Sequence, residues 1–139
     1  MTLEYLETLG VPVIGYQTNT LPAFYAKESP FAIPFRLDKP AEIAACLKAK
    51  WDSELHGGAL IANPVPEEFA LPYEEMENII AEAINEAEAK GIKGKALTPF
   101  LLAKIKQLTA GKSLVSNIEL VRNNAKLTAQ LAVAYHQLP

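Results

Sequence analysis

Asparagine side chains stand at two places in this sequence where an amide group could contact a ligand. Asn63 opens the run Asn-Pro-Val-Pro, in which two prolines make the loop extended and stiff. Asn117, Asn123 and Asn124 lie close together near the end of the chain. Asparagine is a mediocre helix former, and near a core boundary its amide needs a backbone or ligand partner. Both a structural and a ligand-binding role therefore stay open for each of them.

Position favours two of these asparagines as ligand contacts. Asn63 follows an apolar segment predicted to be a buried strand, and open α/β sheets bind ligands at the carboxyl ends of their strands. Asn117 and Asn124 are seven residues apart, which places them on one side of a helix. Asn117 falls in the first turn of that helix, where free backbone N–H groups favour an anionic partner.

The remaining reactive side chains match no common catalytic signature. The sequence has no Gly-x-Ser-x-Gly, Walker A, Gly-x-Gly-x-x-Gly or His-Glu-x-x-His motif. His56 and His136 are far apart and are predicted to be exposed, and the single cysteine, Cys46, is predicted to pack as a small side chain. Lys93 and Lys95 lie in a glycine-flanked loop, which would either meet a phosphate or form an ordinary charged surface.

Strands are predicted where short apolar segments occur between turn-forming residues. Val11–Tyr16 and Ala59–Ala62 are apolar at nearly every position, as strands covered on both faces are. Phe31–Leu37 contains a proline and is predicted to be an edge strand or an extended segment. Gln17–Pro30 is predicted to be a loop with one helical turn after its first proline.

Most of the other segments are predicted to be helices. Thr2–Leu9 ends at Gly10, and the next helix begins with Asp38 as its N-cap and an apolar face that includes Ile43, Leu47, Trp51 and Leu55. A further helix contains Met76, Ile80, Ala83 and Ala87 and ends at Gly91. Thr98 and Ser113 are the predicted N-caps of the last two helices. The apolar stripe of the last helix is predicted to be Leu114, Ile118, Val121, Ala125, Thr128, Ala132 and Tyr135.

This order of elements predicts an α/β fold in α/β/α layers, with a few buried strands followed by a helical C-terminal half. The chain has 139 residues, 50% of them hydrophobic and 21% charged, which suits a single domain over residues 1–139. Two or three strands are few, since natural sheets usually have four to six. The sequence therefore predicts an incomplete part of a larger sheet.

Charge and hydropathy narrow the expected partners and location. The net charge is −3 and no basic stripe is visible, so nucleic acid is not an expected partner. No window approaches the ~20 apolar residues that a membrane-spanning helix needs. The first residues are acidic and lack the basic and apolar regions of a signal peptide, so a cytoplasmic location is expected.

Taken in order, the sequence motifs resemble those of the pseudouridine-5′-phosphate glycosidases, also called the indigoidine synthase A-like family. The resemblance runs from Thr2–Thr18 through Gly57-Gly58, Ala62–Glu67 and Thr98–Leu102 to Ser116–Ala125. It covers essentially the whole chain. Members of the family are roughly twice as long, and this sequence resembles only their C-terminal half.

The resemblance implies the reversible cleavage of pseudouridine 5′-phosphate to uracil and ribose 5-phosphate. Carbon is a poor leaving group, and an imine between C1 of the opened sugar and a lysine supplies an electron sink. In the family a manganese ion stabilises developing negative charge. The family's covalent lysine, proton-donating glutamate and metal-binding aspartate lie upstream of the matched segment, so this chain is expected to hold no catalytic residue and no metal ligand.

The resemblance also implies substrate contacts and an oligomeric state. Asn117 looks like an asparagine that faces the family's substrate site, and Asn63, Thr98 and Thr18 lie in motif loops that border it. The family forms homotrimers. Three interpretations stay open: the C-terminal portion of a glycosidase, a non-catalytic remnant that serves in binding or oligomerisation, and the C-terminal half of a split enzyme completed by a separate N-terminal chain.

Overall fold

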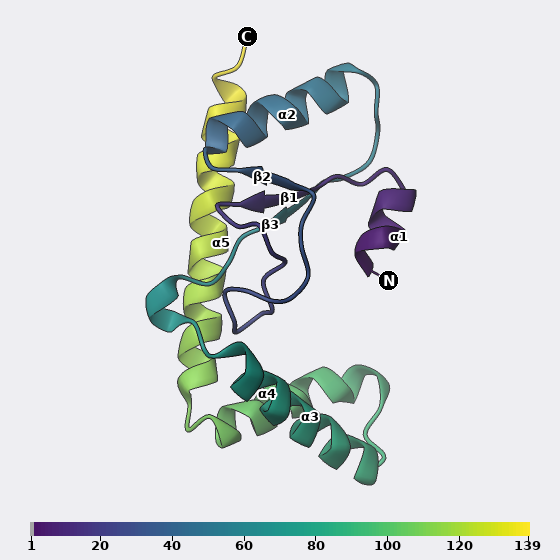
Figure 1. The fold of residues 1–139 in the computed structure, drawn as a ribbon, viewed down its shortest axis with the longest axis vertical. Helices are drawn as coiled ribbons and strands as arrows, with labels where there is room; N and C mark the ends of the chain where they lie inside the picture. Colours follow the sequence, from purple (N-terminus) through teal and green to yellow (C-terminus); the bar gives the residue numbers. More distant parts are fainter. Residues whose placement is uncertain (1) are drawn as a thin grey trace.

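The computed structural model describes residues 2–139 as a mixed α/β structure with a small sheet and mostly helical segments (Figure 1). This confirms the predicted fold class. None of the helices within residues 2–139 combines the length and apolar composition that a bilayer-spanning segment needs. In chain order the elements are α1 (Thr2–Thr8), β1 (Val13–Tyr16), β2 (Phe35–Leu37), α2 (Pro40–Asp52), β3 (Leu60–Ala62), the 3-10 helix η1 (Glu67–Phe69), α3 (Tyr73–Ala89), the 3-10 helix η2 (Gly94–Ala96), α4 (Leu97–Leu108) and α5 (Lys112–His136).

The three strands form a parallel sheet in the order β2-β1-β3. Ile14 in the central strand lies opposite Phe35 on one side and Ile61 on the other. Ile14 is 2% exposed, as expected of a strand covered on both faces. The same expectation is wrong for β3, because Leu60 is 40% exposed and β3 pairs only with β1 among the described residues. The continuation of the sheet beyond these strands stays a prediction.

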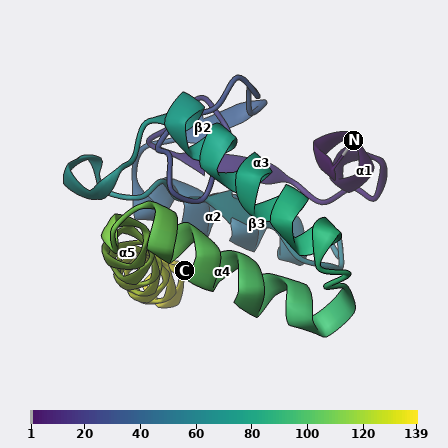
Figure 2. The same ribbon diagram turned by 90° about the horizontal axis from the view of Figure 1, so that it is seen from below.

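Helix α5 runs along the length of the molecule and joins its two ends (Figure 1). We call the part that holds the sheet, α1 and α2 the sheet end, and the part that holds α3, η2 and α4 the helical end. The arrowheads of the strands point toward α5, and α1 lies on the opposite side of the sheet. In the view from below, α3 and α4 lie side by side in front of the sheet (Figure 2).

Each end has its own apolar cluster. At the sheet end Val13, Ile33 and Ala62 are buried, and Leu3 and Leu6 of α1 pack against them. At the helical end the buried residues come from α3, α4 and the loop after β1, and they are Tyr25, Met76, Ala83 and Ile105. The loop that supplies Tyr25 therefore connects the two clusters.

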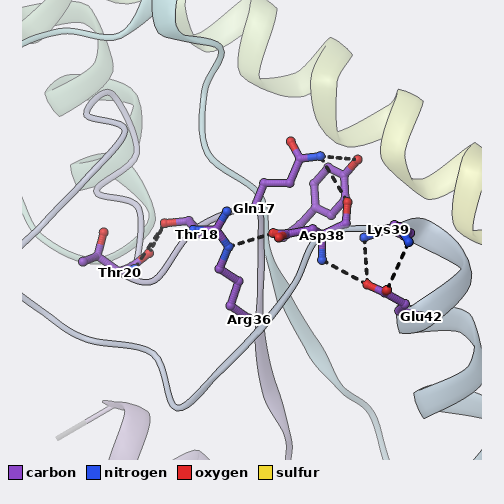
Figure 3. Close-up of polar contacts among 8 residues, drawn as sticks. Gln17, Thr18, Thr20, Arg36, Asp38, Lys39 and Glu42 are labelled. Carbon is purple, nitrogen blue, oxygen red and sulfur yellow. Dashed lines mark hydrogen bonds and ion pairs between the residues drawn. The ribbon is translucent and has the colours of Figure 1, made fainter.

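Helix starts are where sequence-based expectation and structure differ most. Asp38 is not the N-cap of α2, because its carboxylate accepts a hydrogen bond from Arg36 Nε at 2.7 Å (Figure 3). The N-cap is Lys39, and the Glu42 carboxylate reaches back to the backbone N–H groups of Asp38 and Lys39 at 3.3 and 3.2 Å. A carboxylate in the first turn also suits the positive end of the helix dipole.

The other predicted caps shift in a similar way. Thr98 lies inside α4, which begins at Leu97 directly after η2. Ser113 lies inside α5, and its backbone N–H donates to the Thr109 hydroxyl at 3.1 Å, so Thr109 satisfies the first turn instead. The helical turn expected after Pro22 is wrong: a tight turn closed by reciprocal Ala23–Ala26 backbone hydrogen bonds occupies that place.

The apolar stripe predicted for α5 is exposed. Leu114, Ile118 and Val121 are 41%, 43% and 60% exposed, whereas Ser116 and Leu127 are buried. The face that packs inward is therefore rotated by about one residue, roughly 100° around the helix. The inward face packs against α2, and near the start of the helix Ser113 meets the Thr109 hydroxyl.

Candidate functional site

The carboxyl ends of β1 and β3 meet one face of α5. Because the strands are parallel, Gln17 and Asn63, which follow β1 and β3, lie at the same edge of the sheet. This edge faces α5 (Figure 1). Ligands of open α/β sheets bind at such an edge.

Three asparagine amides connect this edge to α5. Asn63 Nδ2 donates to Asn124 Oδ1 at 3.0 Å. Asn123 Nδ2 donates to Asn63 Oδ1 at 3.3 Å and to the Pro64 carbonyl at 2.9 Å. Asn63 therefore has protein partners for both its donor and its acceptor, and the Asn63–Pro64 loop is held in a fixed position against the helix.

A cavity of ≈340 Å³ lies beside these amides. Its walls are the end of β1, the loop from Asn63 to Glu67, Lys27 and one face of α5. The α5 residues in the wall follow helical spacing and are Asn123, Lys126, Leu127 and Gln130. The cavity is large enough for a small polar ligand and lies where the fold class predicts one.

Gln17 occupies an unusual backbone conformation at this cavity. Its φ is 56°, a left-handed value that is uncommon outside glycine and that clusters at functional sites. Its side-chain Nε2 donates to the Tyr16 hydroxyl at 3.3 Å and to the Asp38 carbonyl at 3.1 Å (Figure 3). Thr18, the next residue, is buried, and its hydroxyl donates to the Thr20 carbonyl at 2.9 Å. Thr18 thus shapes the turn behind the cavity without lining it.

Two lysines and one glutamate set the charge of the cavity. Lys27 forms a close ion pair with Glu67, and the hydrogen bond and the attraction from that carboxylate raise the pKa of Lys27. Lys126 makes no ion pair with any residue from 2 to 139. Among the charged side chains that line the cavity, Lys126 is therefore a positive charge without a partner in the described residues.

Asn117 lies in a different cavity, at the helical end. Its predicted place in the first turn is wrong, because α5 begins at Lys112 and Asn117 falls in the second turn, beyond the free backbone N–H groups. This cavity has a volume of ≈190 Å³ and is lined by Tyr25, Lys106 and Ser113 in addition to Asn117. The Ser113 hydroxyl accepts a hydrogen bond from Thr109 at 2.9 Å, and burial raises the pKa of the Tyr25 hydroxyl. The structure thus separates Asn117 from Asn63.

Other expected sites lie apart from both cavities. Thr98 is exposed in the first turn of α4 and lines neither of the two cavities described above. His56, His136, Lys93 and Lys95 are exposed. Cys46 is also exposed, so the expectation that it packs as a core side chain is wrong.

A metal site is not formed by the part of the chain that the structure describes. Within residues 2–139 no three His, Cys, Asp or Glu side chains lie close enough to hold a metal ion. The described residues therefore do not fit the manganese ion that the family resemblance implies.

Sequence reasoning missed most of the residues that line the cavity at the sheet end. Gln17 directly follows a buried strand, which is the same signal that indicated Asn63. Lys126 and Gln130 follow Asn123 by three and seven residues and so share its helix face. Lys27 is brought there only by the tertiary fold, and no spacing indicates it.

Comparison with known proteins decides the family. The family model described as "Indigoidine synthase A like protein" matches residues 1–134. The chain belongs to this family. This match confirms the resemblance to the indigoidine synthase A-like family that the sequence motifs indicated.

Several curated relatives are named pseudouridine-5′-phosphate glycosidase. The protein from Caldanaerobacter subterraneus subsp. tengcongensis is 58% identical over 137 residues, and that from Petrotoga mobilis is 55% identical over 138. Each alignment covers 99% of this chain and 45% of the relative. The chain thus spans about half the length of the curated relatives it matches.

Two solved structures share the fold. The prealnumycin C-glycosynthase AlnA, solved in complex with ribulose 5-phosphate, has a TM-score of 0.85 and 31% identity over 96% of this chain and 44% of its own. An indigoidine synthase A-like protein from Thermotoga maritima has a TM-score of 0.83 and 36% identity, over 95% of this chain and 43% of its own. Both structures therefore keep this arrangement of sheet and helices at modest sequence identity to this chain.

Proposed function

We propose that this chain is the C-terminal portion of an enzyme that reversibly cleaves pseudouridine 5′-phosphate to uracil and ribose 5-phosphate. The observation that carries the proposal is the 58% identity to a relative named pseudouridine-5′-phosphate glycosidase, over 99% of this chain. The solved glycosynthase in complex with ribulose 5-phosphate supports the choice of a sugar phosphate as substrate class.

In this proposal the chemistry is divided between two portions of the enzyme. The covalent lysine, the proton-donating glutamate and the manganese-binding aspartate belong to the portion that precedes the matched segment. This chain supplies side chains that bind and orient the substrate, with Asn117 as the main contact. Asn63, Thr98 and Thr18 are further proposed contacts, and they lie outside the cavity that Asn117 lines. The enzyme works as a homotrimer in the cytoplasm.

Asn117 suits a binding role because its amide lies at a small, mostly apolar cavity. A neutral amide there can donate to or accept from a substrate oxygen. It cannot take part in covalent or acid–base steps at neutral pH, so it acts as a binding group. The tight packing nearby, with Ser113 and Ser116 buried, fixes the helix that carries it.

The second candidate function is a non-catalytic module for binding or oligomerisation. The observation that favours it is the exposed apolar face of α5, which includes Ile118 and Val121. Exposed apolar patches of this kind mark association surfaces. A half-enzyme completed by a separate chain would need the same surface, so activity has to decide between the interpretations.

A chimera tests the proposed function. This chain replaces the matched part of the Caldanaerobacter relative, and uracil release from pseudouridine 5′-phosphate is measured with added manganese. We expect turnover by the chimera and none by the 139-residue chain alone. A folded but inactive chimera would contradict the proposal and favour the non-catalytic module.

Asn117→Asp in the active chimera tests the substrate contact. A carboxylate facing an anionic substrate lowers kcat/KM on the order of 30- to 1,000-fold, through like-charge repulsion in a partly buried site. The melting temperature stays nearly unchanged, because Asn and Asp are nearly equal in size and in helix propensity. The matched control is Asn85→Asp on the exposed surface of α3, which leaves turnover unchanged. Near-native activity of Asn117→Asp would contradict the assignment.

A further inference from the structure

We propose that Tyr25 is a further substrate-binding residue at the cavity of Asn117, where its hydroxyl donates a hydrogen bond to a carbonyl oxygen of the ligand. The identity of that ligand rests on the proposed function, which makes no use of Tyr25. Tyr25 belongs to the loop after β1 and lies far from Asn117 in the sequence, so no motif or spacing connects the two residues.

The backbone around Tyr25 is held on both sides. Ala23 and Ala26 exchange reciprocal backbone hydrogen bonds of 3.0 Å around it, and the Tyr25 carbonyl accepts the Leu71 N–H at 2.8 Å. Phe24 has a φ of 54°, a left-handed value that is rare for a bulky residue and persists only where the surrounding structure enforces it. The turn therefore fixes the place at which Tyr25 enters the helical end.

The ring of Tyr25 is held as firmly as its backbone. Tyr25 is 3% exposed and belongs to the cluster of Met76, Ala83 and Ile105. The Phe24 ring meets the Tyr25 ring edge to face, with 4.6 Å between the ring centroids and 82° between their planes. A side chain that is already immobile loses little conformational entropy when it binds a ligand.

The hydroxyl of this fixed ring has no protein partner. Buried tyrosine hydroxyls usually form hydrogen bonds, but that of Tyr25 forms none with any residue from 2 to 139. Within the same residues, the hydroxyl groups that are both fully buried and unpaired belong to Thr20 and Ser116. The unpaired Tyr25 hydroxyl therefore still touches open space. The cavity of Asn117 is the space that Tyr25 lines, so the hydroxyl faces this cavity.

Asn117 supplies a second unpaired polar group to the same cavity. Its amide forms no hydrogen bond with the described residues, whereas the amide of Asn63 is bonded within the protein. Leu102, Ala103 and Leu114 add apolar side chains to the walls. A phenol and an amide in a mostly apolar cavity suit a small ligand that carries its own hydrogen-bonding groups.

The cavity suits the base of the proposed substrate better than its sugar phosphate. The volume of ≈190 Å³ is below the roughly 300–1,000 Å³ of pockets for drug-sized ligands, so a single ring is a suitable occupant. Uracil is flat and neutral and has two carbonyl oxygens, one for the Asn117 amide and one for the Tyr25 hydroxyl. Burial raises the pKa of the Tyr25 hydroxyl, which therefore keeps the proton that it donates at neutral pH.

The first experiment titrates the 139-residue chain with uracil and follows the side-chain amide resonances of Asn117 by NMR. We expect saturable shifts in the parent chain. Tyr25→Phe removes only the hydroxyl, and the affinity for uracil should fall about three- to tenfold, which corresponds to one neutral hydrogen bond. Absence of saturable shifts in the parent chain, or equal affinities of the parent and Tyr25→Phe, would overturn the proposal.

The matched control is Tyr135→Phe. The Tyr135 hydroxyl is also unpaired among the described residues, and it lies near the C-terminal end of α5, far from Asn117. The ring contact between Tyr135 and Trp51 remains in the variant. Its affinity for uracil should equal that of the parent, and a loss as large as that of Tyr25→Phe would overturn the specific role of Tyr25.

Thermal unfolding separates a binding role from a structural one. The Tyr25 hydroxyl has no protein hydrogen bond to lose, so Tyr25→Phe should leave the melting temperature unchanged or raise it. A melting temperature that falls together with the affinity would assign the hydroxyl to the stability of the fold and overturn the proposal.

The same substitution in the chimera connects binding to turnover. In an active chimera Tyr25→Phe should raise KM for pseudouridine 5′-phosphate by a similar factor, and Tyr135→Phe should leave it unchanged. An active chimera that Tyr25→Phe does not affect would contradict only the role of Tyr25. An inactive chimera whose 139-residue portion binds uracil through Tyr25 would contradict only the proposed function.

Discussion

The sheet end and the helical end of this chain are stabilised in different ways. At the sheet end an apolar cluster is joined by directional polar contacts, as between Asn63 and the amides of Asn123 and Asn124. At the helical end Met76, Ala83 and Ile105 fill space around Tyr25. Hydrogen bonds depend on direction, whereas apolar packing depends mainly on volume.

This difference explains where a ligand site can form. The directional contacts at the sheet end leave polar atoms beside a cavity in fixed positions, which is what specific binding requires. The helical end provides a surface for Asn117 but little polar structure around it. At the sheet end we therefore expect the largest loss of stability where a substitution disturbs a closely fitted backbone turn. At the helical end we expect stability to fall when a substitution removes buried volume or an ion pair.

The largest expected effect comes from Gly15→Ala at the sheet end. A Cβ at Gly15 would lie 2.2 Å from the Thr18 carbonyl oxygen, so the turn after β1 must move. We expect the free energy of unfolding to fall by about 3 kcal/mol, as in a severely overpacked site. Chemical denaturation measures it. Gly58→Ala is the control, because a Cβ there meets no atom within 4 Å. Equal stabilities of the two variants would show that the turn is not closely fitted.

Met76→Ala should have the next largest effect, at the helical end. Met76 is 2% exposed, and truncation leaves a cavity that costs about 2–3 kcal/mol of unfolding free energy. Ile84→Ala on the same helix is the control; Ile84 is 39% exposed, and its truncation should cost less than about 1 kcal/mol. Equal losses of stability in the two variants would show that Met76 does not fill a closed core at this end.

The smallest effect is expected from Glu86→Gln and depends on pH. Lys104 and Lys90 lie 2.7 and 2.6 Å from the Glu86 carboxylate, and their hydrogen bonds lower its pKa from 4.5 to about 2. A lowered pKa in the folded state means that the carboxylate stabilises the fold above pH 4.5. This stabilisation is lost as the pH falls from 4.5 toward 2.

Thermal unfolding between pH 7 and pH 2 measures this effect. The gap in stability between the parent chain and Glu86→Gln should close as the pH falls through this window. Glu88→Gln is the control, since Glu88 makes no ion pair with the described residues. A gap that stays constant with pH would show that the ion pairs of Glu86 do not contribute to stability.

The parts of the fold that depend on local sequence were predictable. β1 and β3 are short apolar segments between turn residues, and both occur close to the expected bounds. The helix caps were not predictable in the same way. Asp38 is a favourable N-cap by type, but Arg36 competes for its carboxylate, and that competition depends on the geometry of β2.

The orientation of α5 shows why the rest could not be predicted. An apolar stripe indicates a buried face only if another element covers it, and here α2, the Thr109 turn and the Pro64 loop lie against a different face of α5. The candidate site was likewise predictable only where local sequence determines it. Asn63 was indicated by its place after a strand, whereas its pairing with Asn123 depends on how α5 is rotated.

Tyr25 has a consequence for the order of folding. The α3–α4 pair is a local helical hairpin, and such units usually fold fast because their contacts are close in sequence. Its cluster, however, includes a side chain from about fifty residues earlier, whose carbonyl also accepts the Leu71 N–H at 2.8 Å. The hairpin therefore reaches its final packing only after a long loop has closed, and the rate of that step is set by residues outside the hairpin.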